Sequence, residues 1–235
     1  MGSSICFFKF EGLSEQIAAE IAEQIITGQL IAGERIQEVR IANAMQVSRA
    51  SVREALQILK RTGLINVYPR RGALVSELDQ QHIESLFRMA DLLITEIIMQ
   101  HDKVDHHQFD GLLQTLQQRL FQQVQAFQPQ QFYDEIFAYL SQFSASCEHL
   151  YLHCMFTDLL PAIRRGYFYA IHVSNYALQE EFFLISKVID AITSKNTHQA
   201  ALFMQDFCRN LCKLVQASLI HIKQAELAWA QCSPH

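Results

Sequence analysis

Hydrophobic positions near the start of the chain repeat with the period of a short amphipathic helix. Isoleucines follow Leu13 at four-residue spacing as far as Ile25, and this pattern predicts a helix over 13–26 with Ser14 as its N-cap. A shorter pattern of the same kind predicts a second helix over 38–45. The chain therefore begins with two helices joined by a glycine-containing connection.

A third helix and a small hairpin are expected next. Ser48 precedes the segment 49–61, which has helical spacing, and a serine in this position is a favoured N-cap. Two β-prone runs, 64–67 and 73–75, flank the turn sequence from Pro69 to Gly72. Three helices followed by a two-stranded hairpin predict a winged helix-turn-helix, whose third helix has the size that the DNA major groove admits.

Beyond Ser76 the sequence contains only long helical patterns separated by brief polar breaks. The fold class is therefore mainly α, with an N-terminal winged helix-turn-helix over 1–78 and an all-α helical bundle over 79–235. Six helices are expected in the second domain, near residues 80–101, 106–127, 130–146, 148–168, 172–195 and 197–230.

Charge is distributed unevenly between these two domains. The net charge of the 235 residues is -5, but residues 1–78 carry nine basic and eight acidic side chains. Within residues 49–71 six basic residues face a single acid, Glu54. A basic segment on an acidic protein indicates a polyanionic partner such as nucleic acid, although a solvated helix face would have the same composition.

The sequence of the second and third predicted helices and the hairpin resembles the GntR family of bacterial transcription factors. The resemblance is carried by the continuous run from Ile41 to Leu56, which contains Val-Ser-Arg-Ala-Ser-Val-Arg-Glu-Ala-Leu, and by the run from Pro69 to Val75. The all-helical remainder resembles the FadR-like branch, whose effector domain is called FCD. The resemblance implies a dimeric, cytoplasmic regulator in which a small effector changes the affinity for operator DNA.

Residues that contact bases and phosphates in this family correspond to defined positions of the present chain. They are Ser48, Arg49, Ser51 and Arg53 on the third helix, and Arg71 and Gly72 at the hairpin. Arg40, at the start of the second helix near the expected backbone track, is a further candidate, although a solvated surface position explains it equally well. Because Arg49 and Arg53 are four residues apart, both guanidinium groups leave one helix face, and each can bind guanine O6 and N7. The sequence departs from the family at Gln46, where glycine is common, and this departure concerns fine sequence specificity.

Many FCD domains bind a divalent metal through one aspartate and three histidines, and the resemblance places these positions at Asp134, Ala138, Ile185 and Phe207. Three of the four side chains here are hydrocarbons, which cannot ligate a metal. We therefore expect no metal and no cofactor at this site, and an apolar effector such as a fatty acid or its thioester. Arg164 and Arg165 are candidates to anchor its acidic head group.

Two alternatives to this interpretation use other residues. His149, His153 and Cys154 have the spacing of a partial zinc site, which would suit a metal-dependent binding or hydrolytic protein. A regulator of small carboxylates is the other alternative. The sequence has no nucleophile elbow, phosphate loop or H-E-x-x-H motif, so we do not expect the protein to be an enzyme. Its six cysteines are expected to be reduced and to fill small apolar spaces.

The expected partners follow from these assignments. They are double-stranded operator DNA, a small-molecule effector and a second copy of the chain. No membrane partner is expected, because no run of about 18 uncharged apolar residues occurs.

Overall fold

A computed structural model of the chain describes residues 12–100, 106–146, 149–170 and 175–232. For residues 106–110, 146, 169, 175–176 and 221–232 it gives the course of the backbone alone. Grouping by internal contacts divides the chain into two compact units. Unit 1 comprises Met1–Leu78 together with Asp158–Arg165, and unit 2 comprises Asp79–Thr157 and Gly166–His235.

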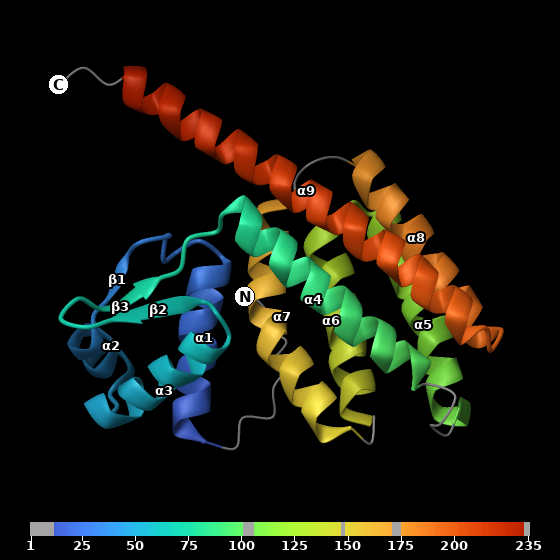
Figure 1. The fold of residues 1–235 in the computed structure, drawn as a ribbon, viewed down its shortest axis with the longest axis horizontal. Helices are drawn as coiled ribbons and strands as arrows, with labels where there is room; N and C mark the ends of the chain where they lie inside the picture. Colours follow the sequence, from blue (N-terminus) through green and yellow to red (C-terminus); the bar gives the residue numbers. More distant parts are fainter. Residues whose placement is uncertain (1–11, 101–105, 147–148, 171–174, 233–235) are drawn as a thin grey trace. The chain divides into compact units, whose positions relative to one another are not determined.

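Residues 12–78 of unit 1 form three helices and a small sheet, which Figure 1 shows at the blue end of the colour scale. In chain order these are α1 (Leu13–Ile26), β1 (Arg35–Ile36), α2 (Glu38–Met45), α3 (Arg49–Arg61), β2 (Ile65–Tyr68) and β3 (Gly72–Val75). The helix-turn-helix is formed by α2 and α3, and the wing by β2 and β3. The winged helix-turn-helix expected from the sequence is confirmed.

The sheet of unit 1 has three strands in the order β1, β3, β2, and both pairings are antiparallel. The two-stranded hairpin expected from the sequence was therefore incomplete. The missing strand, β1, has only two residues, and its Arg35 and Ile36 pair with Leu74 and Ala73. A strand this short has no detectable alternation of apolar and polar residues, so it could not be predicted from the sequence pattern.

The core of unit 1 is formed by the inward faces of its helices and sheet. Val52, Leu56 and Leu59 of α3 are 0 to 4% exposed, as expected. They belong to one cluster with residues of α1, α2 and the strands, which also contains Ile17, Ala18, Ile21, Ile25, Ile36, Ala42, Ala55, Leu64, Ile65, Ala73 and Val75. Burial of this cluster fixes the side of α3 that remains in solvent.

The beginning of α1 differs from the expectation. Ser14 lies inside the helix, whereas the N-cap is Gly12, whose N–H donates to Glu15 Oε2 at 3.4 Å. The hydroxyl of Ser14 donates instead to Glu54 Oε2 of α3 at 2.5 Å. Assigning Ser14 as the cap was wrong because a partner 40 residues away in the sequence takes its hydroxyl.

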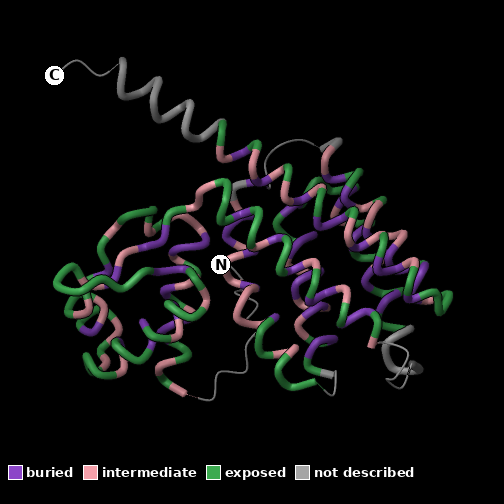
Figure 2. The backbone as a smooth tube through the Cα atoms, viewed as in Figure 1, coloured by how far each residue is buried: buried purple, intermediate pink, exposed green. Residues whose placement is uncertain are grey.

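Unit 2 is a helical bundle. It consists of α4 (Gln80–Met99), α5 (His106–Gln125), α6 (Pro129–Ser146), most of α7 (Leu150–Ala170), α8 (Asn175–Thr193) and α9 (Thr197–Cys232). The long helix α9 packs along α4 and α8, and α5 packs against α6 and α8 (Figure 1). Figure 2 shows buried residues on the faces that these helices turn toward one another. The all-α second domain is confirmed.

The described cysteines differ in how far their side chains are buried. Cys208 is buried and Cys212 is partly buried, whereas Cys154 is exposed, so the expectation of apolar filling was wrong for Cys154. Cys6 and Cys147 lie outside the described residues, as does the side chain of Cys232. No helix in the described part of the chain has an apolar stretch long enough to cross a lipid bilayer.

Candidate nucleic-acid interface and effector region

The turn between α2 and α3 sets the start of the exposed recognition helix. Gln46 adopts the left-handed conformation, with φ 55° and ψ 42°, and the next N–H, that of Val47, donates to Ala42 O at 3.0 Å. A left-handed residue ends α2 and redirects the chain into α3. Glycine adopts this conformation with less strain than glutamine, which gives a physical reason for the glycine that the family resemblance leads us to expect at this position.

Ser48 caps α3 and brings Ser51 next to it. The Ser48 hydroxyl oxygen accepts a hydrogen bond from the Ser51 N–H at 3.0 Å, and the two hydroxyl oxygens lie 2.9 Å apart. The remaining N–H groups of the first turn and the partial positive charge of the helix end suit an anionic phosphate. Both serines therefore lie where a phosphate can bind.

Arg49 and Arg53 extend the same helix but differ in their contacts. Both residues are exposed. Arg53 Nε donates to Glu38 Oε2 of α2 at 2.9 Å, whereas Arg49 makes no side-chain hydrogen bond among the described contacts. Since an exposed ion pair contributes at most about 1 kcal/mol, Glu38 restrains Arg53 only weakly. Of the two guanidinium groups, that of Arg49 is the one ready to bind a base edge.

The wing supplies a second group of basic side chains. Arg70 and Arg71 lie at the exposed tip between β2 and β3, and Arg70 has a positive φ of 64°. Gly72 has a φ of 79°, and a Cβ added there would lie 3.7 Å from Arg35 Nε. Arg35 is exposed on β1 and thus joins the wing, a residue that the sequence analysis missed together with its strand.

Arg40 lies on the exposed side of α2. It lines an open pocket of about 360 Å³ in unit 1 with Arg35, Glu34 and Gln37. The structure thus places all seven predicted DNA-contacting residues on α2, on α3 with its cap, and on the wing of one unit.

Replacing Ser48 separates helix capping from phosphate binding. Ser48→Ala removes the cap and should lower the free energy of unfolding by about 0.5 to 2 kcal/mol. Ser48→Asp preserves a capping oxygen but adds a negative charge, so we expect near-normal stability and clearly weaker DNA binding. Thermal unfolding and DNA titration of both variants test this. Normal DNA affinity in Ser48→Asp would contradict a phosphate contact at this helix end.

The six predicted effector residues do not fall in one unit. Ile185 of α8 and Phe207 of α9 are each 4% exposed, and Asp134 and Ala138 of α6 are partly buried. These four belong to unit 2, whereas Arg164 and Arg165 belong to unit 1. Four of the six predicted residues therefore belong to the helical bundle, on α6, α8 and α9.

Arg165 makes contacts other than those expected. Its side chain is 1% exposed, and Nη1 donates to the Ser76 carbonyl oxygen at 2.8 Å and to Ser76 Oγ at 3.0 Å. Arg164 Nη2 lies 3.5 Å from Glu23 Oε2. The expectation that these arginines anchor an acidic head group is not retained, because backbone and side-chain oxygens of unit 1 already engage both.

A further feature of unit 2 concerns its possible metal ligands. His153 Nδ1 lies 3.0 Å from Ser144 Oγ, and the described residues contain no cluster of three or more His, Cys, Asp or Glu side chains that would hold a metal.

Glu181 of α8 is fully buried, and burial raises the pKa of its carboxyl to about 8. No local pattern in the sequence indicates a buried acid at Glu181.

Comparison with known proteins places this geometry in a family context. Residues 13–75 match the family model described as bacterial regulatory proteins, gntR family. An uncharacterized HTH-type transcriptional regulator of Mycobacterium tuberculosis, Rv0043c, is 29% identical over 42% of this chain and 32% of its own length. The gluconate operon transcriptional repressor of Bacillus subtilis is 23% identical over 83% of this chain and 80% of its own length.

A solved structure shows the same fold. McbR/YncC of E. coli aligns over 92% of this chain and 100% of its own, with a TM-score of 0.69 and 18% identity. The chain spans about a third of the length of the mycobacterial relative. The family match is confined to residues 13–75 in unit 1, and the structural likeness shows that the chain shares the fold of McbR/YncC, including its helical C-terminal part.

Proposed function

We propose that this chain is a DNA-binding transcriptional regulator of the GntR family, controlled by a small effector in its helical domain. The observation that carries the proposal is the exposed face at the start of α3, where Ser48, Ser51 and Arg49 lie at a capped helix end. The wing of the same unit adds Arg71, which is exposed. Titration of the purified protein with duplex DNA, followed by fluorescence anisotropy, tests this function.

The proposed assembly is a cytoplasmic homodimer. Each chain has one recognition helix, and helix-turn-helix proteins read two half-sites about one helical turn apart through a two-fold dimer. We assign the helical domain to the FadR-like (FCD) type on the basis of its helix order. Two copies on one operator double the number of phosphate contacts and the number of bases read.

The proposed effector has an apolar acyl body. Ile185 and Phe207 are buried side chains of the bundle, and Ala138 is partly buried beside Asp134 on α6. Hydrocarbon side chains at these positions favour a hydrocarbon ligand over a metal-bound carboxylate. An acyl ester or thioester of medium chain length fits this chemistry.

A chain-length series tests the apolar effector. We expect each added methylene between eight and twelve carbons to improve affinity about fourfold, since one buried CH₂ contributes about 0.8 kcal/mol. Short dicarboxylates and sugar acids should cause no thermal shift. Phe207→Gln should weaken acyl binding without changing the DNA affinity of the unliganded protein. Phe183→Gln is the matched control, because Phe183 is 58% exposed. A thermal shift given only by small polar acids would contradict the apolar effector.

A further inference from the structure

Glu181 is a buried carboxyl with one oxygen satisfied and one not. Its Oε1 accepts a hydrogen bond from Asn210 Nδ2 of α9 at 2.6 Å. Its Oε2 is buried and has no hydrogen-bond partner among the described residues. Buried polar atoms in native proteins are nearly always hydrogen-bonded. An unsatisfied carboxyl oxygen in an apolar bundle is therefore a place where a ligand can supply the missing partner.

The protonation state of this carboxyl determines which partner it needs. Burial raises the pKa of Glu181 to about 8, and the nearby charge of Glu180 contributes in the same direction. At neutral pH the group is therefore mostly protonated. Because the Asn210 amide donates to Oε1, the proton resides on Oε2 and makes it a donor. A neutral carboxylic acid in an apolar site can donate a hydrogen bond to a carbonyl oxygen.

Other titratable groups that face Glu181 stay neutral around pH 7. They are Tyr133 of α6, Tyr167 of α7 and Cys208 of α9, whose pKa values are all raised by burial. On α4, Asp91 interacts with Cys208 and with Arg209. Glu181 is consequently the group in this cluster that changes charge between pH 7 and 9.

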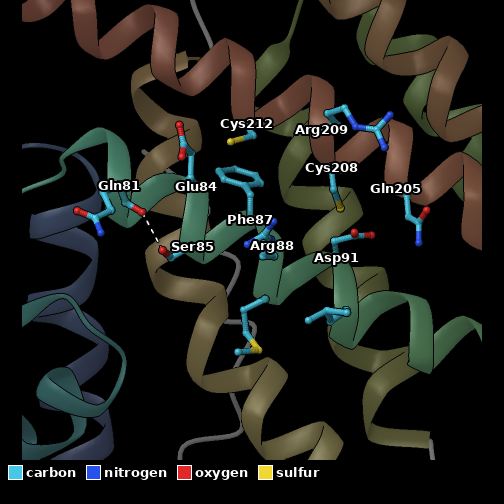
Figure 3. A pocket seen from close by; sticks show the side chains of 12 residues that line it. Gln81, Glu84, Ser85, Phe87, Arg88, Asp91, Gln205, Cys208, Arg209 and Cys212 are labelled. Carbon is cyan, nitrogen blue, oxygen red and sulfur yellow. Dashed lines mark hydrogen bonds between the residues drawn. The ribbon is translucent and has the colours of Figure 1, made fainter.

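An open cavity is lined by two residues that interact with this cluster. An open cavity of about 690 Å³ lies between α4 and α9 (Figure 3), and Phe87 and Cys208 are among its lining residues. Phe87 packs edge-on against Tyr167, with ring centroids 6.3 Å apart. The charge of Glu181 also contributes to the raised pKa of Cys208. Phe87 and Cys208 thus line the cavity and also interact with members of the Glu181 cluster.

The polar pair also neighbours the proposed apolar lining. Glu181 is one helical turn before Ile185 on α8, and Asn210 is about one turn after Phe207 on α9. Residues three or four apart lie on the same helix face. A ligand body against Ile185 and Phe207 therefore has its polar end within reach of Glu181.

We propose that Glu181 and Asn210 form the polar end of the effector site, where the Glu181 carboxyl donates a hydrogen bond from Oε2 to the carbonyl oxygen of an apolar ester or thioester. This proposal rests on the proposed effector function and names the group that recognises the ligand. It also makes the site sensitive to pH, since an ionised Glu181 cannot donate and repels a carbonyl oxygen.

Calorimetric titration with methyl octanoate, and with n-decane as a ligand that lacks the carbonyl, tests the proposal. The wild-type protein should bind the ester roughly tenfold more weakly at pH 9 than at pH 7, as a carboxyl with a pKa of about 8 requires. Decane binding should be the same at both pH values. Glu181→Gln keeps an N–H donor at this position, so it should bind the ester equally well at pH 7 and 9.

Two controls separate this role from a structural one. Glu180→Gln removes the exposed neighbouring charge that helps raise the pKa of Glu181, so ester binding should still weaken with rising pH, but with the midpoint of that change at a lower pH than in wild type. In the ligand-free protein, burial raises the pKa of Glu181 from about 4.5 in the unfolded chain to about 8 in the folded protein. The contribution of Glu181 to the free energy of unfolding is therefore lost as the pH rises from about 4.5 to about 8. The thermal midpoint of wild type should fall over that range more than that of Glu181→Gln.

The proposal is overturned if wild type does not bind the ester, if its affinity does not change with pH, or if the change persists in Glu181→Gln. These results are independent of DNA binding, which is measured separately with the unliganded protein. A protein that binds the ester as described but binds no DNA would overturn the proposed regulatory function and leave the Glu181 site intact.

Discussion

Arg49→Ala is expected to cause a large loss of operator affinity and to relax sequence preference. Arg49 is exposed at the first position of α3 and makes no side-chain hydrogen bond among the described contacts, so its guanidinium can bind a guanine edge in two places. Such a bidentate contact contributes about 1 to 3 kcal/mol of discrimination. Each half-site should therefore lose at least about fivefold, and a homodimer loses both contacts. Fluorescence anisotropy with the operator and with single-base variants measures both effects.

Two other arginine variants serve as controls for Arg49. Arg53→Ala should lower the operator affinity less, because the Arg53 side chain also forms an ion pair with Glu38, whose Oε2 lies 2.9 Å from Arg53 Nε. Arg119→Ala removes the same charge from α5 of unit 2, where Arg119 pairs with Glu135 at 3.3 Å, and should leave DNA binding unchanged. Equal losses in Arg49→Ala and Arg119→Ala would show that net charge, not a base contact, explains the effect.

Salt is expected to weaken DNA binding steeply. The exposed cations near the helix end and wing include Arg40, Arg70 and Arg71, so a dimer would neutralise about six phosphates. Raising the salt concentration from 50 to 200 mM should then lower affinity by roughly 10³-fold through counterion release. The slope of log affinity against log salt, measured over this range, gives the number of phosphates neutralised.

Arg71→Ala should reduce that slope by about one per chain and weaken binding to all sequences alike. This pattern differs from that of Arg49→Ala, which should alter sequence preference. A salt slope near zero in the wild-type protein would exclude the proposed phosphate contacts at the wing.

The sequence predicted the three helices and the β2–β3 hairpin of unit 1 because their signals are local. Ser48 and Gly63 flank α3, and Val52, Leu56 and Leu59 repeat at helical spacing within it. The side of the helix that faces solvent follows directly from this spacing. The basic residues on that side could therefore be identified as a group before the fold was known.

Features that depend on distant partners could not be predicted in the same way. The hydrogen bonds of Arg165 link it to Ser76, 89 residues earlier, and no local pattern indicates such a partner. Glu181 follows Glu180 in the sequence, and an acidic pair of this kind is typical of a solvated helix face. Its burial results from packing between α8 and α9, which becomes visible only when the helices are assembled.

The central claim is that unit 1 reads a specific DNA sequence as part of a homodimer. Selection of bound duplexes from a random 40-base-pair library by the purified full chain, followed by sequencing, tests it most directly. The account predicts one enriched motif with two-fold symmetry, which Arg49→Ala retains only weakly. Recovery of unenriched random sequences, or an equally strong motif with Arg49→Ala, would contradict the assignment of α3 as the recognition helix.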